Sequence, residues 1–185
     1  SELIEYYKGI FTTLSSCASR QLEEVTFRRA TISVPELMAT AGKYFRKVYK
    51  GNKAHIDFKI QPLEGRITGD WNQLRFLLEN LIDEACSVTL DGAVCLSARE
   101  DGEFIRFLFT DMRREKTREE LNQLFYPDLS RMTAGEKGEL YGTEYLVCKQ
   151  IIRDHDEFAG RRGCRINAEP GKEGGFTIYF TLPKK

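Results

Sequence analysis

The sequence predicts an α+β fold, a two-layer α/β sandwich in which helices cover one face of a mixed or antiparallel sheet. Helix-like and strand-like spacings of apolar residues both occur, without the strict alternation that a parallel α/β fold requires. Neighbouring predicted strands often follow one another directly, as on either side of Asp101-Gly102, a favoured hairpin dipeptide. A chain of 185 residues is long enough to bury one core of ordinary size.

The composition argues against several classes of function. Lys+Arg and Asp+Glu each total 28, so the formal charge is zero, which disfavours a general attraction to nucleic acid or anionic membranes. The five cysteines lie far apart with no CxxC spacing, so neither a zinc site nor a disulfide framework is indicated. No apolar run approaches the roughly 18 residues that span a bilayer. We expect a cytoplasmic domain, with any membrane tether lying upstream of Ser1.

Residues 1–24 are predicted to form a separate helical segment. Apolar side chains recur there in alternating steps of four and three, the spacing of a coiled-coil seam. They are Leu3, Tyr7, Ile10, Leu14 and Cys17. A helix that packs on its own domain would show the same pattern, so the spacing alone leaves dimerisation and internal packing open.

Residues 25–185 are predicted to form one domain. The predicted strands cover 25–32, 55–61, a short piece ending at Gly69, 93–99, 104–110, 164–168 and 176–182. The predicted helices cover 33–50, 70–88, 117–125 and 142–154. Two helix starts have capping-box spacing: Ser33 with Glu36, and Thr117 with Glu120. Residues 126–141 show no periodicity and are expected to form a mobile loop.

A series of short motifs occupies the chain from Asp70 onward. Asp70 precedes a helix that carries Asn80-Leu-Ile-Asp-Glu84-Ala. Asp111 directly follows a predicted hairpin. In order and spacing these motifs resemble the ATP-binding domain of sensor histidine kinases, which has Asn-Leu-x-x-Asn-Ala and then Asp-x-Gly-x-Gly. The resemblance implies the Bergerat-type ATP-binding fold.

The resemblance continues to the end of the chain. Residues 124–127 are similar to the family's phenylalanine box, and residues 169–183 are similar to its closing hairpin. In all it covers residues 25–183. In this family the end of a dimerisation helix precedes the ATP-binding domain, so the resemblance favours a dimer formed through residues 1–24.

The resemblance also implies a nucleotide site. Asp111 corresponds to the carboxylate that accepts the adenine amino group. Asn80 and Glu84 correspond to the two asparagines of the family's helix motif, and Glu84 replaces the principal magnesium ligand. Gly142 and Thr143 stand where the second glycine box opens the last long helix. The implied cofactors are ATP and Mg²⁺, and no catalytic residue is assigned.

The glycines that would bring backbone N–H groups close to the phosphates are mostly missing. The first glycine box reads Asp111-Met-Arg113-Arg-Glu115, and only Gly142 remains of the second. Side chains at these positions block close backbone approach, and Glu115 adds negative charge near a triphosphate. We therefore expect an impaired phosphate cradle.

Four basic residues border the implied site: Arg113, Arg114, Lys116 and Lys137. Because Arg and Lys bind phosphate, they offer one route to compensation for the lost glycines. No feature of the sequence directs them inward, however, so we interpret them as residues of a solvated loop.

Two functions follow from the resemblance. One is the ATP-binding, catalytic-type domain of a sensor histidine kinase in two-component signal transduction, with weak or lost nucleotide binding. The other is a pseudokinase that relays a signal as a dimeric interaction module without ATP turnover. His55 and His155 are interpreted as structural or surface residues, so the chain lacks a phosphoacceptor. The implied partners are a nucleotide, a second copy of the chain, an upstream sensor domain and a response regulator.

Overall fold

The computed structural model describes residues 26–127, 133–134, 140–141 and 143–185. The predicted N-terminal helix and most of the predicted loop 126–141 therefore lie outside the described residues. In chain order, the elements are β1 (Ala30–Ser33), α2 (Val34–Tyr49), β2 (Ile56–Gln61), β3 (Arg66–Gly69), α3 (Trp71–Cys86), β4 (Gly92–Asp101), β5 (Phe104–Asp111), α4 (Arg118–Gln123), β6 (Thr133–Ala134), β7 (Leu140–Tyr141), α5 (Glu144–Phe158), β8 (Ile166–Pro170) and β9 (Phe176–Pro183).

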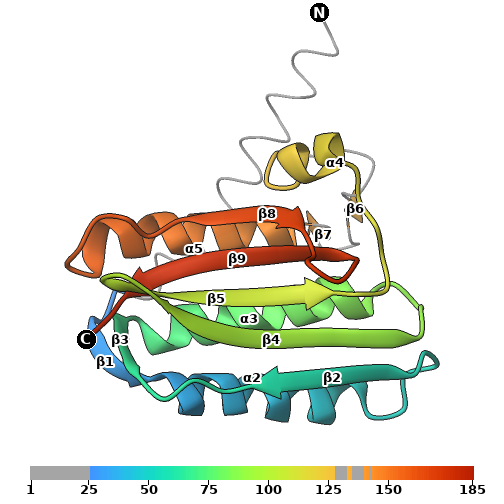
Figure 1. Cartoon of the computed structure of the whole chain (residues 1–185), viewed down its shortest axis with the longest axis horizontal. Coiled ribbons are helices and arrows are strands. Elements are labelled where there is room, and N and C mark those ends of the chain that lie inside the picture. Colours follow the sequence, from blue (N-terminus) through green and yellow to red (C-terminus); the bar gives the residue numbers. More distant parts are fainter. Residues whose placement is uncertain (1–25, 128–132, 135–139, 142) are drawn as a thin grey trace, which may run out of the picture.

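The main sheet has five strands in the order β2-β4-β5-β9-β8 (Figure 1). The β2–β4 pair is parallel, and the other three pairs are antiparallel. Helices α2, α3 and α5 lie across one face of this sheet, as Figure 1 shows. The predicted α+β sandwich with a mixed sheet and helices on one face is thus confirmed. The central strand, β5, ends at Asp111.

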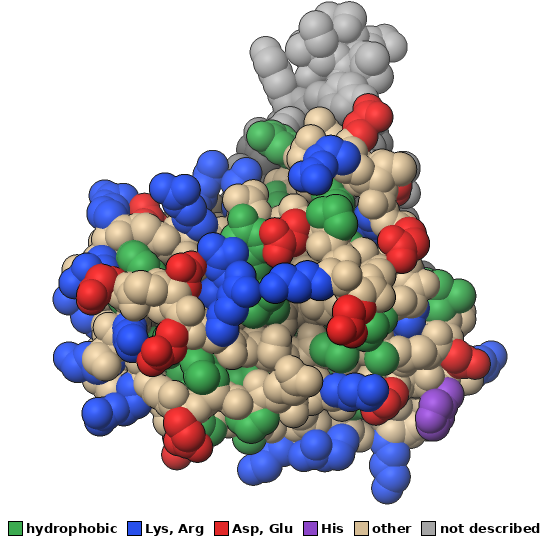
Figure 2. All heavy atoms as spheres, in the orientation of Figure 1, with side chains coloured by type: hydrophobic (Ala, Val, Ile, Leu, Met, Phe, Trp, Pro, Cys, Tyr) green, Lys and Arg blue, Asp and Glu red, His purple; other side chains and the backbone are tan. Residues whose placement is uncertain are grey.

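The other face of the sheet is polar. In Figure 2, which has the same orientation as Figure 1, basic and acidic side chains are interspersed over this face and hydrophobic ones form small groups. On this side the guanidinium of Arg106 lies 4.5 Å from the centre of the Tyr179 ring. A half-solvated sheet of this kind is typical of antiparallel and mixed architectures.

Strand alternation decides where Asp111 points. Along β5, Ile105, Phe107 and Phe109 are buried against the helices, and every second residue between them faces the open side. Asp111 continues the buried series and is only 1% exposed. Since successive side chains of a strand alternate between faces, its carboxylate is directed into the helix layer and not into solvent.

Helices α3 and α5 run antiparallel beneath the sheet. The N-terminal end of α3, capped by Asp70, lies at the C-terminal end of α5, where Asp70 contacts His155. Midway along the pair, the thiol of Cys148 contacts the carbonyl oxygen of Leu77. The C-terminal end of α3 and the N-terminal end of α5 therefore meet at the other side of the domain, next to the end of β5.

Several element boundaries differ from the prediction by a few residues, and two of these differences have a clear physical reason. The first strand begins at Ala30, because Phe27 packs on α5 and so does not extend the strand. In the β4–β5 hairpin Asp101 pairs with Phe104, so the turn is Gly102-Glu103, one residue later than predicted. Gly102 has a φ of 60° at the first turn position, which a type II′ turn requires.

Candidate nucleotide site

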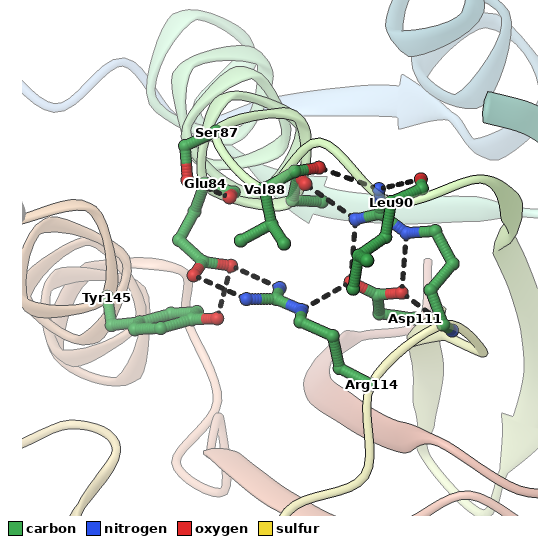
Figure 3. A network of polar contacts seen from close by, with 9 residues as sticks. Glu84, Ser87, Val88, Leu90, Asp111, Arg114 and Tyr145 are labelled. Carbon is green, nitrogen blue, oxygen red and sulfur yellow. Dashed lines mark hydrogen bonds and ion pairs between the residues drawn. The ribbon is translucent and has the colours of Figure 1, made fainter. Parts of the chain in front are cut away.

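The structure brings two of the predicted site residues together. Glu84 lies on the last turns of α3, and Asp111 ends β5 (Figure 3). Both are buried, Glu84 at 7% and Asp111 at 1% exposure. They do not touch directly; Arg114 lies between them, and Tyr145 from the first turn of α5 closes the group. We call Glu84, Asp111, Arg113, Arg114 and Tyr145 the arginine cluster.

Arg113 forms a two-pronged ion pair with Asp111. Its Nε and Nη2 atoms each lie 2.9 Å from a carboxylate oxygen, and its backbone N–H donates to the same carboxylate at 3.0 Å. The remaining donors of the guanidinium bind carbonyl oxygens at or just beyond the end of α3, those of Ala85, Val88 and Leu90. The side chain is 1% exposed, so Arg113 is fully built into the domain.

Arg114 bridges the two carboxylates. Its Nε donates to Asp111 at 2.9 Å, while its Nη1 and Nη2 donate to the two oxygens of Glu84 at 3.3 and 3.0 Å. The hydroxyl of Tyr145 also donates to Glu84. Figure 3 shows these contacts as one continuous chain of hydrogen bonds from α5, through Glu84 and Arg114, to Asp111.

The cluster favours the ionised forms of Asp111 and Arg114. Burial alone would raise the pKa of Asp111, but the hydrogen bonds from Arg113, together with both arginine charges, lower that pKa below its ordinary value. Burial disfavours the charged form of Arg114, yet the hydrogen bond and charge of Glu84 raise the pKa of Arg114. With two guanidinium groups facing two carboxylates, the buried charges balance.

The next two residues of this loop, Glu115 and Lys116, also contact neighbouring elements. The Glu115 carboxylate accepts a hydrogen bond of 2.8 Å from the backbone N–H of Gly175, in the turn between β8 and β9. Lys116 lies over the ring of Phe176, 5.2 Å from its centre. Glu115 and Lys116 therefore hold this loop against its neighbours.

These positions correct one interpretation made from the sequence. Arg113 and Arg114 were expected on a solvated loop, but both point inward, with side chains 1% and 14% exposed. They do not line an open phosphate site either, because they bind carboxylates of the protein. The sequence did contain a signal, because the resemblance places Glu84, a carboxylate in the position of an amide, and Arg113, an arginine in the position of a glycine, in one site. Lys137, the fourth basic residue, lies outside the described residues.

The other predicted ligands take no part in the cluster. Asn80 donates its side-chain amide to the carbonyl of Phe76, one turn back in its own helix, at 2.8 Å. Thr143 precedes α5 without a side-chain capping hydrogen bond, and Gly142 lies outside the described residues. Among the described residues, no group of three or more His, Cys, Asp or Glu side chains is arranged to hold a metal.

Adenine and Mg²⁺ do not fit the arrangement as it stands. An ionised carboxylate has about four acceptor sites, and Asp111 already accepts four hydrogen bonds, all from Arg113 and Arg114. Both oxygens of Glu84 are bound by Arg114. An adenine amino group or a metal ion would have to displace an arginine from one of these carboxylates.

The sequence of this domain matches a known protein family. Residues 69–185 match the family described as histidine kinase-, DNA gyrase B- and HSP90-like ATPases. Because that match spans more than half of the sequence, the chain belongs to this family. None of the described helices is long and apolar enough to cross a membrane.

Individual relatives agree with the family. The adaptive-response sensory kinase SasA of Thermosynechococcus vestitus is 26% identical over 177 residues, which are 94% of this chain and 44% of that protein. The nucleotide-free catalytic domain of the histidine kinase ThkA has a similar fold, with a TM-score of 0.65, 18% identity, and coverage of 86% of this chain and 97% of that one.

A longer ThkA structure, in complex with the response regulator TrrA, gives a TM-score of 0.69 at 18% identity and covers 98% of this chain and 49% of that one. The chain thus spans less than half of the curated relative and about half of this longer kinase.

Proposed function

We propose that this chain is the ATP-binding-type domain of a sensor histidine kinase in two-component signalling, with weak or lost nucleotide binding. The observation that carries the proposal is the saturation of Asp111 by Arg113 and Arg114. Hydrogen bonds between ions are roughly twice as strong as neutral ones. If adenine bound, Asp111 would lose hydrogen bonds to charged arginines and gain one hydrogen bond from the neutral adenine amino group. Binding of adenine at Asp111 is therefore unfavourable.

The metal side of the site supports the same proposal. Glu84 would have to release Arg114 before it could bind Mg²⁺. Release would leave Arg114 with Asp111 as its one carboxylate partner in the cluster, and breaking a buried ion pair costs about 3–5 kcal/mol. The side chains that replace the glycines already block close approach of the backbone to the phosphates. The contacts to adenine, to the metal and to the phosphates are therefore all impaired. This pattern favours the pseudokinase, an interaction module that relays a signal without ATP turnover.

The histidines are consistent with this role. His155 is fully buried, with Nε2 accepting from the Asp70 backbone N–H at 3.0 Å and Nδ1 bonded to the Ile151 carbonyl at 2.8 Å. It is therefore held as a structural residue. His55 is exposed and lies directly before β2. Any phosphotransfer would need a histidine from another domain.

The partners follow from the proposed role. Residues 1–24 would pair with a second copy of the chain, and the domain would respond to an upstream sensor domain and act on a response regulator. SasA is a sensory kinase and ThkA was solved with a response regulator, which supports these partner classes. We place the domain in the cytoplasm, where two-component phosphorelay takes place.

Calorimetric titration with ATP and with adenosine, each with and without Mg²⁺, tests the proposal. We expect both ligands to bind more weakly than about 1 mM, with no gain from the phosphates or the metal. A triple variant (Glu84→Asn, Arg113→Gly, Arg114→Ala), checked for folding by circular dichroism, should gain measurable adenosine binding because it frees Asp111. If ATP binds wild type a hundredfold better than adenosine does, about 2.7 kcal/mol, the phosphate cradle works and the proposal is wrong.

A further inference from the structure

Residues 26–29, which we call the strap, connect the N-terminal segment to β1 and lie against the end of α5. The Phe27 ring packs edge-on against His155, with ring centres 4.9 Å apart, and lies 5.6 Å from the ring of Phe158. Arg29 donates from Nε to the Phe158 carbonyl at 2.9 Å, at the C-terminal end of the helix. The strap is therefore attached to α5 by both ring packing and a capping hydrogen bond.

The strap is attached to α3 as well, through Asp70. One carboxylate oxygen of Asp70 accepts the Arg28 backbone N–H at 2.7 Å, and the other caps α3 by accepting the N–H of Gln73 at 3.1 Å. The backbone N–H of Asp70 donates to His155. Asp70 and His155, 1% and 0% exposed, thus join the strap, the start of α3 and the end of α5 in one buried group.

The arginine cluster occupies the opposite ends of the same two helices. Glu84 stands on the last turns of α3, and Tyr145 on the first turn of α5. Asp70 and Glu84 are 14 positions apart along α3, which corresponds to about 21 Å of helix at 1.5 Å per residue. Each helix is therefore held by hydrogen bonds at both of its ends, by the strap at one end and by the arginine cluster at the other.

The interior of the pair is close-packed. Leu74, Leu77 and Leu78 on α3 and Cys148, Ile151 and Ile152 on α5 are at most 2% exposed. Packed helices move as units and settle in discrete arrangements, because a dense core does not deform continuously. A shift of α5 along α3 would therefore strain the hydrogen bonds at both ends together.

We propose that the strap and the arginine cluster are energetically coupled through α3 and α5, so that the position of the N-terminal segment sets the state of the cluster. In a domain whose own arginines fill its nucleotide site, this link would carry a signal from the N-terminal segment to the former ATP site. The coupling concerns the packing of the two helices and does not depend on whether nucleotide binds.

A double-mutant cycle on the full chain, measured by urea unfolding, tests the coupling. The variants are Phe27→Ala, Arg114→Met and the pair. Substitutions this far apart normally add. We expect the pair to depart from additivity by at least fivefold in the unfolding constant, about 1 kcal/mol. The matched control combines Phe27→Ala with Arg106→Ala on the open face of the sheet, and this combination should be additive.

Hydrogen exchange provides a second readout. The Arg113 backbone N–H, bonded to Asp111, should exchange several-fold faster in Phe27→Ala, although the substitution lies at the other end of the helices. If Phe27→Ala fails to fold, Arg29→Gln removes one strap contact and takes its place. Additive unfolding constants with unchanged exchange at Arg113 would overturn the inference, whatever the outcome of the nucleotide titrations.

Discussion

The guanidinium of Arg113 lies against the carboxylate of Asp111, with one nitrogen 2.9 Å from each carboxylate oxygen. The two residues are separated by one position in the chain, so this ion pair needs no ligand and little chain ordering to form. Arg113 also binds carbonyls at the C-terminal end of α3, where a positive charge is favourable. Arg113 thus both neutralises the aspartate and caps the helix.

Replacing Arg114 by Met should strongly destabilise the domain. The change keeps most of the side-chain volume but removes the charge that offsets Glu84 and part of the charge that offsets Asp111. Removing one partner of a buried ion pair costs about 3–5 kcal/mol. We expect a loss of this size in the free energy of unfolding, measured from urea midpoints at constant m-value.

The matched control for Arg114→Met is Arg106→Met. Arg106 pairs with Asp101 at 3.0 Å, but the two side chains are 25% and 45% exposed. Exposed pairs contribute about 0–1 kcal/mol. If Arg114→Met costs no more than this control, the arginine cluster does not stabilise the fold as we describe.

Stability should depend on pH through His155. Burial lowers the pKa of His155 to about 4 from an ordinary value of 6.5. Below pH 6.5 the unfolded chain takes up a proton at this site that the folded chain does not, so stability falls between pH 6.5 and pH 4 and is retained in full above pH 6.5. The difference corresponds to about 3 kcal/mol at 1.36 kcal/mol per pH unit.

The comparison of His155→Gln with wild type isolates this contribution. A glutamine oxygen can accept the Asp70 N–H, yet it does not titrate. Unfolding free energies measured between pH 4 and pH 7 should therefore rise less steeply with pH in the variant. Equal slopes for wild type and His155→Gln would show that His155 is not held neutral.

Gly175→Ala should disrupt the loop that carries Arg113 and Arg114. Gly175 has a φ of 71°, and an added Cβ would lie 2.1 Å from the carbonyl oxygen of Asp111. The control, Gly102→Ala, also has a positive φ, of 60°, but meets nothing within 4 Å. We expect Gly102→Ala to lower the free energy of unfolding by about 1 kcal/mol. Gly175→Ala should lower it clearly more, which would appear as a larger drop in melting temperature. Similar melting temperatures would contradict the close approach of this turn to Asp111.

The predicted dimer depends on the seam in residues 1–24. Replacing Ile10 and Leu14 by Asp should convert a dimer to a folded monomer in sedimentation experiments, because charges in an apolar seam are not tolerated. Thr12→Asp with Ser15→Asp, off the seam, is the matched control and should stay dimeric. A wild-type chain that is monomeric at high concentration would contradict the seam. A lower melting temperature without a change in mass would show that the stripe packs internally.

Local signals in the sequence predicted much of the fold. Ser33 and Asp70 accept the backbone N–H groups expected of helix caps, and Thr117 with Glu120 forms a complete capping box. The buried alternation of β5 placed Asp111 at the end of a central strand, as predicted. These features depend on residues close together in the chain, which is why a single sequence shows them.

The site depended on contacts that no local pattern encodes. Arg114 is 30 positions from Glu84, and Tyr145 is 61 positions from it. The strap was predicted as strand because its residues have strand propensity, but ring packing on His155 outweighed that preference. The direction of a charged side chain depends on its partners, and only the folded chain brings these partners together.

The most direct test is to observe the guanidinium groups while nucleotide is added. Two-dimensional NMR spectra of the Arg side-chain Nε–H groups, assigned with Arg113→Lys and Arg114→Lys variants, should show two protected, slowly exchanging signals. We predict that both signals stay unchanged as Mg²⁺ and ATP are raised to millimolar concentrations, because both arginines remain on Asp111. A saturable loss or shift of these signals with added ATP would show that nucleotide displaces the arginines and would contradict the account.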